Sequence, residues 1–221
     1  VYIAEDNSLP LITISGYYKT GTINDPGGKE GLGKFAVNLM RTGGTKDIPA
    51  DELDDLIDHY AISFSFSMRQ TQLNVKVQFL SQFIDTALYI FKQIIFHPAF
   101  EDNRIDKERE IAIQEINHRF DNPEPVLDAA YQRNMYPEGE NSRLSSEKSM
   151  NSITKNDLIK FHRSVFKTEN AIYGIAGNFS KNDILNKLES MFPKAVNDSP
   201  SVKFPSIDVS PKAKYLIVHK E

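Results

Sequence analysis

Residues 31–40 read Gly31-Leu32-Gly33-Lys34-Phe35-Ala36-Val37-Asn38-Leu39-Met40. Apolar side chains recur there every three or four residues, which is the spacing of an amphipathic helix. We expect this helix to run from about Lys29 to Arg41, with Gly43-Gly44 ending it. Its apolar stripe consists of Leu32, Phe35, Ala36, Leu39 and Met40. Lys34 and Asn38 lie one turn apart on the opposite face.

Predicted strands lie on both sides of this helix. Val1–Glu5 and Leu11–Tyr18 precede it, separated by a turn-like Asp6-Asn7-Ser8. After a second helix over Ala50–Tyr60, residues 61–69 and 72–79 alternate between apolar and polar side chains. Alternation with period two is the mark of a half-buried strand, so these two segments predict a hairpin.

The rest of the chain is mostly helical by the same criteria. The predicted helices cover residues 81–95, 102–120, 123–135, 155–166 and 180–191, and a strand covers residues 170–177. Strands that are interrupted by runs of helices indicate an α+β fold. We expect a two-layer sandwich in which a mixed or antiparallel sheet is covered by helices on one face.

Residues 1–195 are predicted to form a single domain, followed by a change in composition. Residues 193–211 are rich in Pro and Ser, which is typical of a linker. The apolar stretch Tyr215–His219 comes next. We therefore interpret residues 196–221 as a linker and the first strand of a following domain that the chain cuts short.

Composition excludes several classes of function. The 221 residues carry 26 basic and 30 acidic side chains, a net charge of −4, and no Lys/Arg-rich block, so nucleic acid is not an expected partner. No apolar run is long enough to span a bilayer. The absence of cysteine excludes disulfides, thiolate catalysis and cysteine-ligated zinc. The compartment stays open, although the many Lys, Asn and Ile residues favour a bacterial periplasm or cytoplasm.

The helix predicted at 102–120 carries two carboxylates that lie above one another. Glu108 and Glu115 are seven residues apart, on the shoulder of the apolar face. Such a pair can orient a metal or a cationic partner. The alternative is the solvated edge of an acidic helix, and spacing alone favours this second interpretation.

The chain resembles one known family over nearly its whole length. The segments that carry the resemblance are residues 1–11, the loop from Gly21 to Gly33, Leu39-Met40-Arg41-Thr42-Gly43-Gly44-Thr45, Phe96-His97-Pro98-Ala99-Phe100, residues 153–162 and residues 170–178. Their order and spacing are similar to those of the insulinase/pitrilysin-type zinc metallopeptidases, the inverzincins, which include the mitochondrial processing peptidase. The resemblance implies one repeat of about half a family subunit.

The same resemblance implies that this chain has lost the chemistry of its zinc helix. The two zinc histidines of the family fall on Lys34 and Asn38, and the general-base glutamate falls on Val37. The third ligand falls on Glu115, and an auxiliary glutamate falls on Glu108. Catalytic zinc needs three protein ligands, and a valine cannot take a proton from water. We therefore expect no catalytic residue and no bound metal here, although zinc is the cofactor of the family.

A replacement contact follows from the retained carboxylates. If the family geometry holds, the helix face that carries Lys34 and Asn38 is turned toward Glu108 and Glu115. We expect the Lys34 ammonium to lie near the vacant zinc position and to neutralise the two carboxylates. The alternative is that Lys34 points into solvent.

Three functions remain open from the sequence. The favoured one is a non-catalytic metallopeptidase-like domain that pairs with an active zinc-peptidase subunit, or with the second half of its parent chain, to enclose an extended peptide substrate. Alternatively, the parent protein is an active zinc metalloendopeptidase whose His-x-x-Glu-His lies elsewhere. A third interpretation is a structural subunit of a larger complex.

Overall fold

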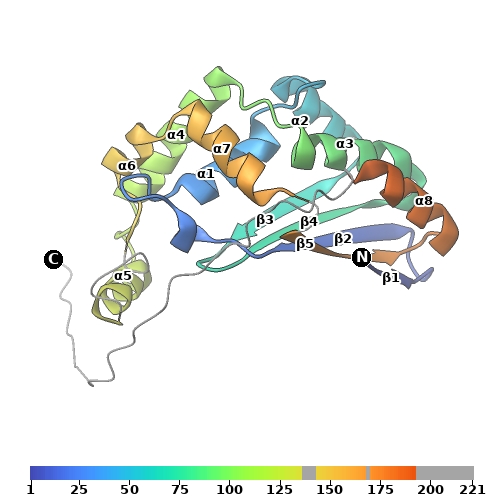
Figure 1. Cartoon of the computed structure of the whole chain (residues 1–221), viewed down its shortest axis with the longest axis horizontal. Helices are drawn as coiled ribbons and strands as arrows, with labels where there is room; N and C mark the ends of the chain where they lie inside the picture. Colours follow the sequence, from blue (N-terminus) through green and yellow to red (C-terminus); the bar gives the residue numbers. More distant parts are fainter. Residues whose placement is uncertain (136–142, 168–169, 193–221) are drawn as a thin grey trace.

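A five-stranded sheet and a layer of helices form the body of the protein (Figure 1). The computed structural model describes residues 1–135, 143–167 and 170–192. The predicted linker and following strand, residues 196–221, lie outside the described residues. The strands are β1 (Tyr2–Glu5), β2 (Leu11–Tyr18), β3 (Ser63–Met68), β4 (Leu73–Leu80) and β5 (Ala171–Gly177), in the spatial order β1-β5-β2-β4-β3.

The sheet is mixed, as the order of elements predicted. β1 pairs with β5 in parallel, whereas β2 pairs in antiparallel fashion with both β4 and β5. The predicted hairpin is confirmed, because β3 and β4 pair antiparallel from Met68 opposite Leu73 to Ser63 opposite Gln78. Among the described strands, β3 therefore forms one edge of the sheet and pairs with β4 alone.

Helices cover one face of the sheet, which confirms the predicted two-layer arrangement (Figure 1). They are α1 (Leu32–Thr42), α2 (Ala50–His59), α3 (Ile84–Phe96), α4 (Asp102–Asn117), α6 (Glu147–Ser152), α7 (Lys155–Val165) and α8 (Lys181–Met191). α5 (Pro123–Met135) lies beside the sandwich rather than on it (Figure 1). Among the described residues, no helix combines the length and the apolar character that crossing a membrane requires.

The core lies between the sheet and this helical layer. Alternate residues of β4 are buried, namely Leu73, Val75, Val77 and Phe79, and Ile12 and Ile14 of β2 join them. α3 contributes the fully buried Phe91, whose ring stacks on Phe64 and meets Tyr173 edge-on. Phe91 thus links the edge strand β3 to β5 through the helical layer.

Three elements differ from the sequence-based expectation. α1 begins at Leu32 rather than near Lys29, because Gly31 adopts a left-handed conformation with φ of 99° that a continuing helix does not contain. α6 was not predicted at all, since its six residues are too short to show helical periodicity. α4 ends at Asn117, so Phe120 lies beyond it and is 43% exposed instead of extending the apolar face.

Candidate functional site

A buried carboxylate places the first turn of α1. Asp25 is only 4% exposed and accepts hydrogen bonds from two backbone N–H groups, Gly31 N to Oδ2 and Gly33 N to Oδ1, each at 2.9 Å. The first N–H groups of a helix have no partner inside the helix, so this carboxylate satisfies them. A side chain at position 33 would be crowded, because a Cβ atom there would lie 3.0 Å from Asp25 Oδ1.

Asp25 also makes stability depend on pH. Burial raises the pKa of Asp25 to about 6, although the Gly31 and Gly33 N–H groups lower it. Because the folded-state pKa lies above the unfolded one, the stabilisation is complete below pH ~4 and is lost as the pH rises through about 6. We expect this residue to lower the free energy of unfolding by about 2 kcal/mol between pH ~4 and pH ~6, and by about 3 kcal/mol over the whole titration. The measurement is urea unfolding at closely spaced pH values.

The matched variant for this experiment is Asp25→Asn. It cannot titrate, so its stability should change less with pH between about 4 and 6 than that of the parent chain. Asn also turns an N–H donor toward one of the two backbone N–H groups, so the variant should be less stable than the parent near pH 4. Identical pH profiles for the two proteins would remove Asp25 as the titrating group.

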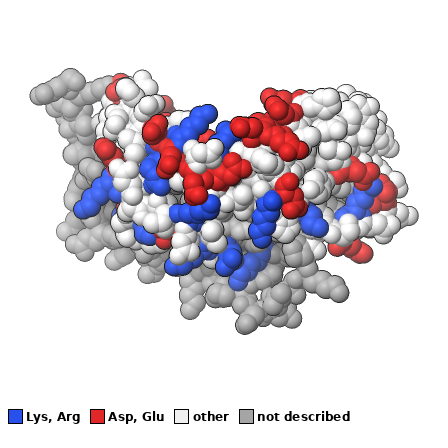
Figure 2. Space-filling model, turned by 90° about the horizontal axis from the view of Figure 1, so that it is seen from above, with Lys and Arg blue, Asp and Glu red and all other residues white. Residues whose placement is uncertain are grey.

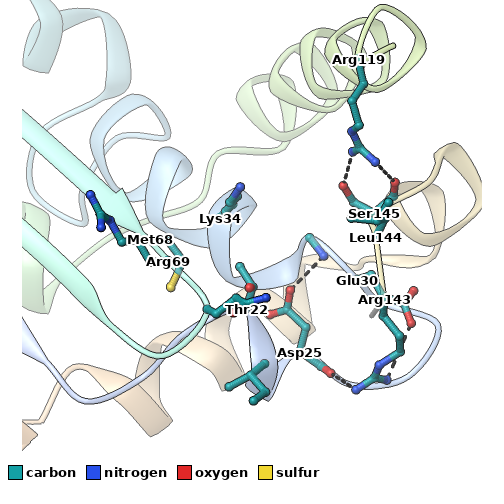
Figure 3. A pocket seen from close by; sticks show the side chains of 13 residues that line it. Thr22, Asp25, Glu30, Lys34, Met68, Arg69, Arg119, Arg143, Leu144 and Ser145 are labelled. Atoms are coloured by element: carbon teal, nitrogen blue, oxygen red, sulfur yellow. Dashed lines mark hydrogen bonds and ion pairs between the residues drawn. The ribbon is translucent and has the colours of Figure 1, made fainter. Parts of the chain in front are cut away.

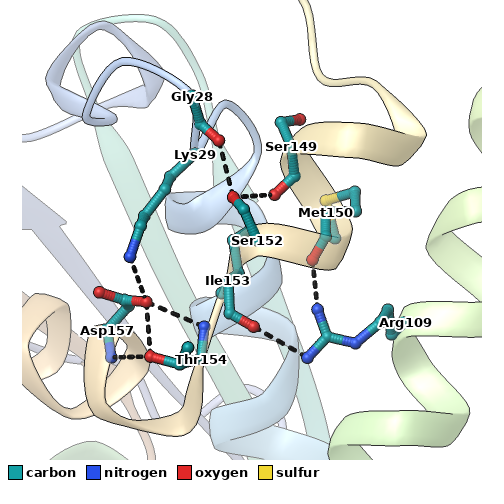
Figure 4. A network of polar contacts seen from close by, with 9 residues as sticks. All are labelled: Gly28, Lys29, Arg109, Ser149, Met150, Ser152, Ile153, Thr154 and Asp157. Atoms are coloured by element: carbon teal, nitrogen blue, oxygen red, sulfur yellow. Dashed lines mark hydrogen bonds and ion pairs between the residues drawn. The ribbon is translucent and has the colours of Figure 1, made fainter.

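The loop before α1 is fastened to α6 and α7 (Figure 4). The Lys29 ammonium lies 2.5 Å from Asp157 Oδ2, and Ser152 Oγ donates to the carbonyl of Gly28 at 2.7 Å. Across from them, the Arg109 guanidinium on α4 donates to the carbonyls of Met150 and Ile153.

The same Arg109 lies 5.5 Å from the centre of the Phe35 ring on α1. The described parts of α4, α6 and α7 thus form a frame around the N-terminal half of α1.

α1 and α4 face each other across a pocket of about 460 Å³. Four of the sequence-predicted site residues line it: Lys34, Asn38, Glu108 and Glu115. Within the described residues, one hydrogen bond joins two of them across the pocket: Asn38 Nδ2 donates to Glu108 Oε2 at 2.6 Å. The structure therefore places these predicted residues of α1 and α4 around one pocket.

Lys34 lies in this pocket, but no ion pair joins its ammonium to Glu108 or Glu115 among the ion pairs of the described residues. The side chain at position 34 is exposed. The expected neutralising contact of Lys34 therefore stays a prediction. The hydrogen bond to Glu108 on α4 comes from Asn38 instead. Asn is one turn further along α1, and its shorter side chain is held by a partner 70 positions away in the chain.

The fifth predicted position, Val37, is almost completely buried at 2% exposure. It borders a smaller hollow between α1 and the end of β3, together with Phe66 and Met68. An isopropyl group at this place supplies packing and can neither bind nor polarise a water molecule. Within the described part of the chain, no group of three or more His, Asp or Glu side chains is placed to hold a metal ion.

Sequence reasoning missed three residues that shape this region. Asp25, Arg69 and Arg119 come from a loop, a strand end and a helix end, and they meet around one pocket with Lys34. None of them belongs to a motif with characteristic spacing. Only the turn-forming run Asp25-Pro26-Gly27-Gly28 could have drawn attention to the first.

Comparison with known proteins gives a consistent family match. A family model described as insulinase (peptidase family M16) matches residues 2–147, and a second, described as the peptidase M16 inactive domain, matches residues 152–221. An uncharacterized zinc protease of Rickettsia bellii is 25% identical over 188 residues, which are 84% of this chain and 45% of the relative. A Helicobacter pylori protein named non-peptidase homolog YmxG is 20% identical over all of this chain and 51% of its own length.

Solved structures share the fold. The crystal structure of a peptidase M16 inactive domain from Pseudomonas fluorescens superposes with a TM-score of 0.82 at 15% identity, covering 93% of this chain and 50% of the other. The crystal structure of a protease from Helicobacter pylori gives a TM-score of 0.78 at 18% identity. The chain spans about half the length of the relatives that it matches.

Proposed function

Because this chain belongs to the insulinase family, peptidase family M16, we propose that it is a non-catalytic half that pairs with a catalytic one. The catalytic part is either a homologous zinc-peptidase subunit or the second half of the parent protein. Together the two halves enclose a chamber for an extended peptide, and this chain supplies walls and contacts. The Helicobacter relative that is named a non-peptidase homolog supports this proposal.

The observation that carries the proposal is the hydrogen bond between Asn38 and Glu108. These residues stand where the resemblance puts a zinc histidine and the auxiliary glutamate, and their atoms meet at 2.6 Å. A direct amide–carboxylate bond occupies a carboxylate that a metal-binding face would keep for the ion and its orienting shell. Val37, next to Asn38 on α1, is 2% exposed and belongs to the hydrophobic core.

β3 is a suitable place for the peptide. It is an edge strand, and its outward side chains Ser63, Ser65 and Ser67 are small and exposed. The unpaired backbone groups of an edge strand can bind an extended segment as an additional strand. The C-terminal end of β3 borders the same hollow as Lys34 and Asn38, so a peptide on this edge would pass the degenerate site.

Two measurements test the proposal. Calorimetric titration of the chain with ZnCl2 should reveal no stoichiometric site, because only one family ligand position retains a ligand side chain. Peptidase activity should appear only after a catalytic family member is added, and should then exceed that of the catalytic member alone by at least about tenfold, or ~1.4 kcal/mol in barrier height. A submicromolar zinc site in this chain, or no gain on mixing, would contradict the proposal.

An active parent protein is the second candidate, favoured by the rickettsial relative's name of zinc protease and by the half-length match. In that case the longer protein carries an intact His-x-x-Glu-His in its other half. It would hydrolyse peptides without any added subunit. A purely structural subunit would neither hydrolyse peptides alone nor raise the activity of an added catalytic family member.

A further inference from the structure

Cationic side chains gather around a second pocket, next to the degenerate site. This pocket has a volume of about 220 Å³ and lies between the end of β3, the loop before α1 and the end of α4 (Figure 3). Four cationic residues line it: Lys34, Arg69, Arg119 and Arg143. Two acidic residues, Asp25 and Glu30, line it as well.

Both acidic residues are engaged with other groups. Asp25 binds the backbone at the start of α1, as described above. Glu30 accepts a hydrogen bond from Gly28 N at 2.9 Å and pairs with Arg143 at 3.7 Å. Arg143 in turn donates to the backbone carbonyl of Asp25 at 3.2 Å. These contacts account for Glu30, Asp25 and Arg143. The cationic residues of the pocket that remain to be described are Lys34, Arg69 and Arg119.

The remaining three cations form no ion pair within the described structure. Arg119 donates to Ser145 O at 3.0 Å and to Ser145 Oγ at 2.7 Å, which are both uncharged acceptors (Figure 3). Burial lowers the pKa of the Arg119 guanidinium, since no carboxylate offsets the loss of hydration. The ion pairs found among the described residues include neither Lys34 nor Arg69.

This excess of positive charge is local. Lys/Arg and Asp/Glu side chains are interspersed over the helical face (Figure 2), and the whole chain is slightly acidic. Lys34 and Arg119 also line the neighbouring pocket that contains Glu108 and Glu115. They form no ion pair with these carboxylates within the described residues.

We propose that this pocket binds a carboxylate group of an extended peptide that is paired with β3, which makes the preferred peptide an acidic one. Arg69 directly follows Met68, the last residue of β3, so the strand edge leads to the pocket. A guanidinium group binds a carboxylate through two parallel hydrogen bonds, which suits Asp, Glu or a C-terminus. The inference rests on the proposed function, because it assumes a peptide on this edge.

The probe is a pair of fluorescein-labelled peptides of about ten residues, rich in Thr and Val to favour strand pairing. One contains three Glu residues and its twin contains Gln at the same places. Fluorescence anisotropy with the full chain should show about tenfold tighter binding of the Glu peptide, and raising NaCl from ~0.05 M to ~0.5 M should remove most of this preference. Inorganic phosphate serves as a competitor that carries negative charge but cannot pair with β3 as a strand.

Substitutions locate the effect. Arg69→Gln should lower the preference for the Glu peptide about three- to tenfold, and Arg119→Gln should act in the same direction. Lys76→Gln is the matched control, because Lys76 is an exposed cation on the outward face of β4 and should leave the preference unchanged. Circular dichroism and melting curves would test whether each variant is folded. Because Arg69 is exposed, we expect Arg69→Gln to melt at the same temperature as the parent chain.

The possible outcomes separate the two proposals. Equal binding of the Glu and Gln peptides overturns the carboxylate pocket while leaving a peptide site on β3. Phosphate binding that Arg69→Gln weakens, without any peptide preference, also overturns it in favour of a small-anion site. If neither peptide binds, both this inference and peptide binding at β3 fail. If Lys76→Gln and Arg69→Gln reduce the preference for the Glu peptide to the same extent, the preference comes from general charge. That result also overturns the pocket.

Discussion

The double variant Lys34→His/Asn38→His is expected to bind zinc, whereas we expect no stoichiometric site in the parent chain. Positions 34 and 38 are one turn apart on α1, and both line the pocket that contains Glu108 and Glu115 on α4. Two imidazoles and the Glu115 carboxylate would supply the three protein ligands of an open zinc site. We expect a dissociation constant in the micromolar range or below, a gain of at least about a hundredfold in calorimetric titration with ZnCl2.

Two further substitutions in the double variant control this result. Glu115→Gln should abolish the gained site, since it removes the third ligand. Glu110→Gln is the matched control, because Glu110 is an exposed carboxylate on the same helix and does not line the pocket. Zinc binding should also raise the melting temperature of the double variant. A folded double variant that binds no zinc would mean that α1 and α4 do not present these positions to one another.

Phe91→Ala is expected to cause a large loss of stability. Phe91 is fully buried, stacks on the Phe64 ring at 6.4 Å between centroids, and meets the Tyr173 ring edge-on at 6.1 Å. Truncation leaves a cavity between the helical layer and two strands, so the free energy of unfolding should fall by about 3–5 kcal/mol. For a chain of this size, the melting temperature should fall by about 10 °C. Urea unfolding and calorimetry measure both quantities.

Tyr89→Ala is the matched control on the same helix. Tyr89 lies two residues before Phe91, has nearly the same size, and is 48% exposed. Its truncation should change the free energy of unfolding by less than about 1 kcal/mol. Similar losses for the two variants would show that α3 is rotated about its axis relative to the described packing.

Local patterns foretold most of the architecture, because they depend on neighbours in the chain. The alternation along residues 72–79 predicted the buried face of β4, and Leu73, Val75, Val77 and Phe79 are all nearly inaccessible. The cap of α7 is equally local, because the Thr154 side chain accepts from Asp157 N three residues along the chain. The ends of helices were less predictable. α1 begins at Leu32 rather than near Lys29 because Gly31, in the loop before it, has a left-handed conformation.

The candidate site was only partly within reach of the sequence. The predicted replacements of the zinc-site residues by Lys34, Val37 and Asn38 rest on the resemblance, which supplied the positions to compare. The pairing of Asn38 with Glu108 was not foreseen, since an asparagine carries no signal for a partner 70 positions away. The cationic pocket was missed because Arg69 and Arg119 belong to separate elements without a shared spacing.

The division between the two levels has a physical cause. Periodicity records which face of a helix or strand prefers water, and the fold follows from it. Residue type records which groups can bind a metal or take a proton, and together with the resemblance it predicts the loss of the zinc chemistry. Which polar atoms meet depends on how α1 packs against α4 and on the rotamers that this packing allows. The choice of Asn38 over Lys34 as the partner of Glu108, and the burial of Asp25 beneath α1, were decided only there.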